Sequence, residues 1–230
     1  MKVYELKLKV YACRDIKSED SLSCVSELID KSFLKNPRFV KFHEENKYKN
    51  YVHNSLYPIE ESKLYKAGNI YAVIIRTVEE ELAEHFQKVL VNEYTEALKA
   101  LTIEKKLIPQ RYIEKIYSLT PAIAKFQGGY WRGVENLESF EKRLRENLIK
   151  KYNSYFNTKL KEDFELFTFT KFDNPMPIVC KYKNIKLLGD KLTLSVAENE
   201  TAQQLAYFAL GSGILEMNSR GFGYVNFKWL

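Results

Sequence analysis

The sequence predicts an α+β protein made of two tandem ferredoxin-like (RRM-like) domains, each with the element order βαββαβ. The same order of strand and helix patterns occurs twice along the 230 residues. The length and the 45% hydrophobic content are sufficient for two cores of about 110 residues each. We place the boundary near Leu119 to Pro121, with domains at 1–118 and 119–230 and no long linker between them.

The first half begins with a strand pattern, because apolar residues at every second position from Tyr4 to Val10 alternate with charged ones. Apolar residues then recur at helical spacing from Leu22 to Phe33. Acidic residues at 79–81 suit the start of a second helix. The remaining elements of this half are strands at 48–57, 70–75 and 101–107, which complete βαββαβ.

The second half repeats this order. Its longest element is a helix from Leu137 to Phe156, with an apolar stripe at 140, 144, 148 and 152. Alternation at 192–196 predicts a strand, and a helix at 200–210 follows. The other expected strands lie at 115–124, 164–172, 178–187 and 222–228.

Composition excludes several classes of protein. The 36 Lys and Arg residues outnumber the 30 Asp and Glu, a mildly basic balance that is compatible with a polyanionic partner. The longest uncharged stretch, Thr201 to Leu215, is too short to span a bilayer, and the N-terminus lacks a signal-peptide pattern. Three cysteines without CxxC spacing support neither a disulfide framework nor a zinc ribbon. We therefore expect a cytoplasmic protein without membrane contact.

Four of the nine glycines lie between Gly211 and Gly223. This segment follows a predicted helix, whereas a dinucleotide-binding fingerprint follows a strand, and it has no Walker lysine pattern. One interpretation is a bare backbone surface that receives phosphate oxygens or an RNA strand. The alternative is that Gly211 ends the helix and the other glycines form turns.

The stretch from Arg220 to Phe227 departs from the RNP1 consensus of RNA-recognition motifs only at Tyr224. In that module RNP1 lies on the third strand and is followed by a helix and a fourth strand, but here only three residues follow Phe227. This excludes an ordinary recognition motif. An aromatic strand that stacks on bases remains open.

The tandem arrangement and its glycine loop resemble the CRISPR-associated endoribonucleases of the RAMP superfamily, which cut the repeats of CRISPR precursor RNA. Two further stretches are similar to that family. One is His43–Lys49 running into Tyr51–Ser55, and the other is Leu119–Pro121, which precedes the predicted helix from Leu137 to Phe156 with its many basic residues. The loop residues that match the family pattern are Gly211, Gly213, Arg220, Gly221, Phe222 and Gly223. The resemblance implies that these residues contact repeat RNA.

Metal-independent RNA cleavage requires proton transfer from the 2′-OH and to the leaving 5′-oxygen, which histidine performs near neutral pH. His85 lies on the apolar side of a predicted helix and is expected to be structural. His43 lies in a polar stretch and is the catalytic candidate, with a solvated loop residue as the alternative. His53 is the other candidate. The resemblance implies His43 with Lys49, or with Lys47 in its place; it does not identify a catalytic tyrosine.

The binding surface is predicted from a charge run. Lys142 to Lys161 contain seven basic residues and one acidic residue. Such a helix could hold RNA phosphates, although a solvated helix face is the common alternative. The predicted RNA contacts on the helix are Lys142, Arg143, Arg145, Lys150 and Lys151.

Together these observations predict an endoribonuclease that binds CRISPR repeat RNA and leaves 2′,3′-cyclic phosphate and 5′-hydroxyl ends, with no metal and no cofactor. The competing hypothesis is a non-catalytic RNA-binding subunit of a CRISPR ribonucleoprotein complex. A third hypothesis is a small-ligand regulatory protein with this fold, but it leaves the basic helix unexplained. Association with an effector complex and homodimer formation are left open.

Overall fold

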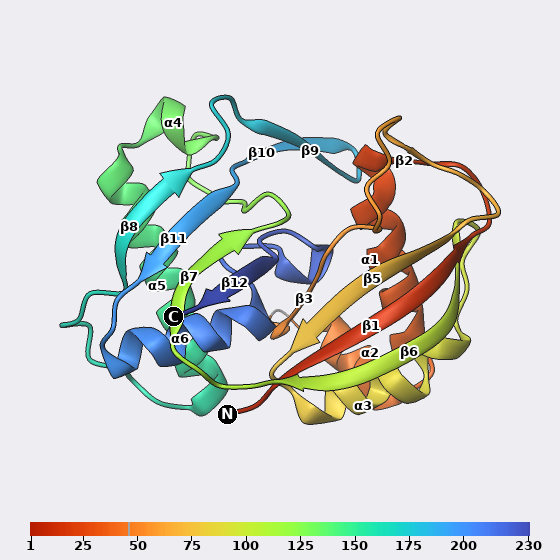
Figure 1. Ribbon diagram of the computed structural model, residues 1–230, viewed down its shortest axis with the longest axis horizontal. Coiled ribbons are helices and arrows are strands. Elements are labelled where there is room, and N and C mark those ends of the chain that lie inside the picture. Colours follow the sequence, from red (N-terminus) through yellow and green to blue (C-terminus); the bar gives the residue numbers. More distant parts are fainter. Residues whose placement is uncertain (46) are drawn as a thin grey trace.

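The computed structural model describes residues 1–45 and 47–230 (Figure 1). Its first sheet has the order β3-β5-β1-β6, with antiparallel pairing throughout. This is the ferredoxin-like order, with the first strand inside the sheet and the last at its edge. The elements are β1 (Val3–Ala12), α1 (Ser21–Phe33), α2 (Pro37–Glu44), β3 (Tyr51–His53), β5 (Ile70–Thr77), α3 (Glu80–Lys88) and β6 (Leu98–Ile108). A separate ribbon joins β2 (Ile16–Lys17) to β4 (Leu64–Tyr65).

Alternation along β1 decides which face of this sheet is buried. Leu6, Leu8 and Val10 are fully buried, while Lys7 and Lys9 between them are exposed. A shift of pairing by one residue would move the apolar side chains to the solvent face, so burial fixes the register. The helices cover the apolar face (Figure 1).

The second sheet has the order β12-β7-β11-β8, again with antiparallel pairs. A hairpin of β9 and β10 is inserted between β8 and β11 and forms a separate two-stranded sheet. The elements are β7 (Ile113–Ser118), α4 (Trp131–Val134), α5 (Leu137–Phe156), β8 (Phe167–Phe172), β9 (Ile178–Tyr182), β10 (Ile185–Gly189), β11 (Leu192–Val196), α6 (Glu200–Ser212) and β12 (Val225–Trp229). The predicted pair of ferredoxin-like domains is confirmed.

The sheet topology corrects the boundary between the domains. β7 pairs with β11 and β12 and so belongs to the second sheet, although the predicted boundary at 118/119 assigned it to the first domain. The change of domain falls at residues 109–112, between β6 and β7. The predicted strand at 115–124 is also shorter at its end, because β7 stops at Ser118.

Arg76 of β5 joins the two domains. Its buried guanidinium donates from Nε to Glu5 Oε2 at 2.8 Å and from Nη1 to the Val225 carbonyl of β12 at 2.7 Å. It also lies over the Tyr224 ring, 4.8 Å from the centroid. On another part of the junction, the Tyr207 hydroxyl of α6 donates to the Ile108 carbonyl at 2.6 Å. These contacts hold side chains from the two halves in one fixed arrangement.

Within residues 1–45 and 47–230, no helix combines the length and the apolar content that crossing a bilayer requires.

Candidate active site at the domain junction

The glycine loop connects α6 to β12 and lies against the first domain. Gly211 is still helical, and a Cβ there would lie 2.8 Å from Val78 Cγ1, so its absence allows α6 to approach the end of β5. Gly213, Gly221 and Gly223 have φ angles of 73°, 84° and 67°. Such angles are readily adopted only by glycine. The loop therefore needs glycine for its backbone path and for close packing.

The glycine loop does not form the predicted bare backbone surface for RNA in the free protein. All four glycines are buried, and the backbone N–H groups of three of them donate to protein carbonyls. Phe222 is also buried, in a small cluster with Ile123 and Cys180. The prediction that Gly211, Gly213, Gly221, Gly223 and Phe222 contact RNA is therefore corrected, because protein atoms already occupy the space around them. Arg220 differs, since a quarter of its side chain is exposed.

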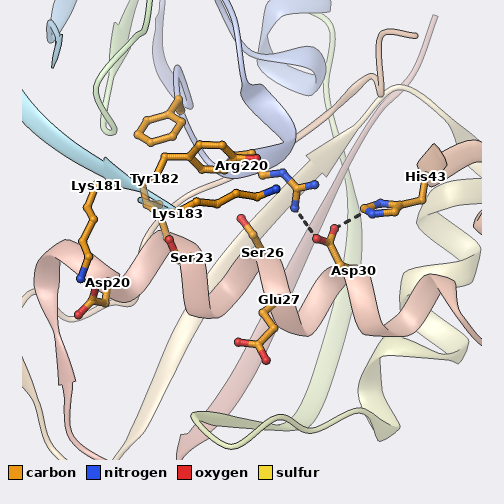
Figure 2. Close-up of a pocket in the computed structure, with 12 residues that line it drawn as sticks. Asp20, Ser23, Ser26, Glu27, Asp30, His43, Lys181, Tyr182, Lys183 and Arg220 are labelled. Atoms are coloured by element: carbon orange, nitrogen blue, oxygen red, sulfur yellow. Dashed lines mark hydrogen bonds and ion pairs between the residues drawn. The ribbon is translucent and has the colours of Figure 1, made fainter. Parts of the chain in front are cut away.

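Arg220 reaches across the junction to an acidic residue that the sequence analysis did not identify. Its guanidinium forms an ion pair with Asp30 Oδ2 of α1, and His43 Nδ1 lies 3.5 Å from the other oxygen of the same carboxylate. Figure 2 shows Asp30 between the two side chains. Burial opposes the charge on Arg220, but the hydrogen bond and the negative charge of Asp30 outweigh it and raise the pKa of Arg220. One carboxylate thus links the imidazole of one domain to the guanidinium of the other.

His43 lies on the last turn of α2 rather than in the loop that the sequence predicted. The sequence did carry a signal for this helix, because Asn36 accepts a hydrogen bond from the Arg38 N–H and Pro37 occupies the first turn. A third of the His43 side chain is exposed. The imidazole is therefore held on a helix end, yet it is accessible from solvent.

The three side chains line a cavity of about 450 Å³ between α1, the β9–β10 hairpin and the glycine loop. Lys181 and Lys183 of the hairpin also line this cavity, and Figure 2 shows the Lys183 side chain alongside Arg220. Lys181 Nζ lies 2.7 Å from Asp20 Oδ1. The polar residues of α1 that line the cavity are Ser23, Ser26, Glu27 and Asp30. Their helical spacing places them on one face of α1, and this is the sequence signal that could have indicated a polar wall there.

His53 lies behind this cavity, out of reach of a substrate. Its side chain is fully buried, with Nε2 3.0 Å from Ser26 Oγ and Nδ1 3.0 Å from the Asn54 carbonyl oxygen. Burial lowers the pKa of His53 to about 4, so the ring is neutral at physiological pH. In the free protein the His53 ring has no exposed surface and both of its nitrogens have protein partners, which argues against the predicted catalytic role of His53.

Lys47 and Lys49 face a second, smaller cavity of about 230 Å³. Lys49 Nζ donates to the carbonyls of His43 at 3.2 Å and Glu45 at 2.6 Å, and also to that of Phe42. Lys49 thus satisfies carbonyls at the end of α2, directly below His43. Burial lowers the pKa of Lys49. Lys47 is exposed and pairs with Glu45 at 3.1 Å. Asn46, within the same predicted stretch, lies outside the described residues.

The basic residues of α5 do not form one phosphate-binding surface. Arg143 pairs with Glu216 at 2.6 Å, and Lys150 pairs with Glu146 at 3.0 Å. Lys142 and Arg145 line a groove between α5 and β8. Lys151 is only 3% exposed, and burial lowers its pKa to about 7. The prediction that Lys151 contacts RNA is therefore corrected.

Comparison with known proteins finds a family model that is similar to the second half of the chain. Residues 118–227 match the family model described as "CRISPR associated protein Cas6, C-terminal". The second half of this chain is therefore similar to the C-terminal part of Cas6 proteins. No curated protein matches the sequence.

Solved structures extend the likeness to Cas6 over nearly the whole chain. A protein described as "CRISPR associated protein Cas6" has a TM-score of 0.73 at 19% identity, covering 98% of this chain and 99% of that one. "An RAMP protein binding different RNA substrates" has a TM-score of 0.71 at 15% identity, covering 98% and 99%. Cas6 from Thermus thermophilus has a TM-score of 0.62 at 13% identity, covering 99% and 98%. These likenesses establish the Cas6 fold, and the predicted family resemblance is confirmed.

Proposed function

We propose that this chain is an endoribonuclease that binds CRISPR repeat RNA and cuts it at the junction between its two domains. The observation that carries the proposal is the cluster of His43, Asp30 and Arg220 on one wall of a solvent-accessible cavity. The Cas6 C-terminal match and the names of two neighbours, an RAMP protein binding RNA substrates and a Cas6 product complex, support RNA as the ligand.

His43 is the proposed proton-transfer group. Asp30 Oδ1 lies 3.5 Å from Nδ1 and has no hydrogen-bond partner among the described residues of the free protein, so a small approach of the two groups on RNA binding would hold the tautomer with the proton on Nδ1. Nε2 is then the ring nitrogen available to the substrate. It can accept the proton of the 2′-OH as that oxygen attacks phosphorus, or in its protonated form deliver a proton to the departing 5′-oxygen.

Arg220 is the proposed phosphate-binding group. Its ion pair with Asp30 uses one side of the guanidinium, and the fork geometry of arginine leaves further N–H donors for phosphate oxygens. Lys183, which lines the same cavity, adds positive charge to it. Donors that are already in place stabilise the charge that develops on the phosphate oxygens during attack.

The proposed reaction breaks the bond between phosphorus and the 5′-oxygen and forms a bond between phosphorus and the 2′-oxygen. One product ends in a 2′,3′-cyclic phosphate and the other in a 5′-hydroxyl. One proton leaves the 2′-OH and one is gained by the 5′-oxygen, so substrate and products carry the same number of protons. His43 performs one of these two transfers, and solvent water is the partner of the other. Lys49 supports the step indirectly, because it holds the helix end that carries His43.

The test is a cleavage assay with repeat RNA in EDTA, using the wild-type chain, His43→Ala and Lys41→Ala. Lys41 lies on the same helix and is exposed, which makes Lys41→Ala the matched control. We expect His43→Ala to slow single-turnover cleavage by about 10²-fold or more, since a positioned acid or base contributes 10²–10⁴-fold. Lys41→Ala should cleave at the wild-type rate.

A repeat RNA with a 2′-deoxy sugar at the cut site supplies the second arm. It should bind the wild-type chain but resist cleavage. Cleavage of the deoxy RNA, or an unaffected rate in His43→Ala, would contradict the proposed mechanism. Tight binding of unmodified RNA by the wild-type chain without any cutting would instead support the RNA-binding subunit.

A further inference from the structure

Lys151 is the basic residue of α5 that turns away from solvent, and it points into the glycine loop. Its Nζ donates to the carbonyls of Gly213 at 3.1 Å and Leu215 at 2.6 Å, and to Asn218 Oδ1 at 2.5 Å. An ammonium group has three N–H donors. Three oxygen acceptors surround Nζ here, so the three donors of the protonated form are all used within the protein.

Asn218 continues this network across the loop. It is 8% exposed, and its Nδ2 donates to the Ile214 carbonyl at 2.8 Å and the Phe222 carbonyl at 2.9 Å. One amide therefore ties the start of the loop to its end. A Cβ on Gly213 would lie 2.5 Å from Asn218 Nδ2, so the glycine leaves room for this amide.

The network sets the direction of Arg220. A single 3₁₀ turn, η3 (Asn218–Arg220), begins at Asn218 and ends at Arg220. Within it the Arg220 N–H donates to the Met217 carbonyl, and the Gly221 N–H donates to the Asn218 carbonyl, each at 2.9 Å. Because the turn starts on the residue that Lys151 holds, a displaced Asn218 would carry Arg220 away from Asp30.

We propose that Lys151 and Asn218 are positioning residues that fix the 3₁₀ turn, so that Arg220 reaches Asp30 beside His43. The inference rests on the proposed cleavage function for its catalytic consequence, but the contacts that define it lie within the free protein. Lys151 acts only through Arg220, since its own ammonium is buried and its three donors are occupied.

The test combines Lys151→Met, Arg220→Met and the double variant in single-turnover cleavage at saturating RNA. Lys88→Met is the control, because Lys88 is an exposed lysine of α3 that pairs with Glu84 on the same helix. We expect Arg220→Met to slow cleavage by about 10²-fold or more, the scale of a lost transition-state donor. Lys151→Met should slow it by about tenfold or more, up to the loss seen in Arg220→Met. If Lys151 acts through Arg220, the double variant should be no slower than Arg220→Met alone.

A merely structural role of Lys151 predicts a different pattern. The fold-decrease in cleavage rate caused by Lys151→Met would then multiply with the fold-decrease caused by Arg220→Met. A double variant that is slower by this product would overturn the inference. An unaffected rate in Lys151→Met would also overturn it. If Lys151→Met fails to fold, Asn218→Asp takes its place in the comparison of single and double variants. This substitution keeps an oxygen for Lys151 and removes the amide donors to Ile214 and Phe222.

Hydrogen exchange in the absence of RNA separates this inference from the proposed function. The readout is the exchange rate of the Arg220, Gly221 and Gly223 amides. We expect these rates to rise by about tenfold or more in Lys151→Met or Asn218→Asp and to stay at wild-type values in Lys88→Met. If the wild-type chain cuts no RNA while these rates still rise, the proposed function fails and the positioning role holds. Unaffected exchange would overturn the positioning role whatever the activity.

Discussion

Substituting Gly221 tests most directly whether the glycines of this loop are needed for close packing against the first domain. Its φ angle is 84°, and a Cβ there would lie 2.6 Å from His53 Cε1 and 2.7 Å from Leu22 Cδ2. The His53 ring cannot turn aside easily, because Ser26 and the Asn54 carbonyl hold its two nitrogens. Gly68 has nearly the same φ, 86°, but nothing lies within 4 Å of its Cβ position. The two sites therefore share a backbone penalty and differ in packing.

This difference sets the expected magnitudes. An alanine in the left-handed region costs about 1 kcal/mol, and this applies to both Gly68→Ala and Gly221→Ala. Inserting a methyl group into a filled site costs roughly 1–3 kcal/mol more, and this applies to Gly221→Ala only. For a chain of this size, each kcal/mol lowers the melting temperature by about 2–4 °C. We therefore expect Gly221→Ala to melt roughly 2–12 °C below Gly68→Ala.

Urea unfolding of the RNA-free variants measures the free-energy difference directly, and thermal unfolding checks it. Binding of a non-cleavable 2′-deoxy repeat RNA is measured on the same samples. If the glycine served RNA contact instead, Gly221→Ala and Gly68→Ala would have equal stability and only Gly221→Ala would lose affinity. That result would refute the packing explanation.

Two further predictions concern buried charge. Arg76→Met should lower the free energy of unfolding by about 3–5 kcal/mol in urea, because among the described residues it leaves the largely buried Glu5 carboxylate with Lys106 as its remaining ion-pair partner. A loss below 1 kcal/mol would contradict this. His53 has a folded pKa of about 4, below its ordinary value of 6.5, so the unfolded chain binds more protons between these values and stability falls as pH decreases through this window. Lowering the pH from 7 to 5 should cost the wild-type chain about 2 kcal/mol more than His53→Gln, and parallel pH profiles in urea would disprove the assignment.

The fold was predictable because its signals are local. Alternation along β1 and the apolar stripe of α5 each reflect burial against one neighbouring layer, and the order of such patterns gave both domains. The boundary was misplaced because β7 directly follows β6 along the chain. Only its pairing with β11 and β12 assigns β7 to the second sheet.

The candidate site was predictable only in part, because burial at the junction depends on the opposite domain. His43 and Arg220 were identified from their residue types and from the family pattern. His53 and Lys151 looked equally suited to contact RNA, but Gly221 packs on the imidazole and the loop carbonyls surround the ammonium. Asp30 was missed because its helical spacing indicates only a polar face of α1, and its role depends on Arg220, which comes from the other domain.

The glycine pattern indicated the region of the candidate site, but the glycines serve close packing there and not the expected contact with RNA. Gly211 leaves room for the end of β5, Gly213 for the Asn218 amide, and Gly221 for the His53 ring. Two of these contacts are with the first domain and the third is within the loop, so the glycines allow a loop of the second domain to fold tightly and pack against the first. Such a loop necessarily carries the intervening Arg220 to the first domain, where Asp30 and His43 lie. The glycines therefore indicate where the domains meet, and the chemistry proposed for that place belongs to the side chains that they bring together.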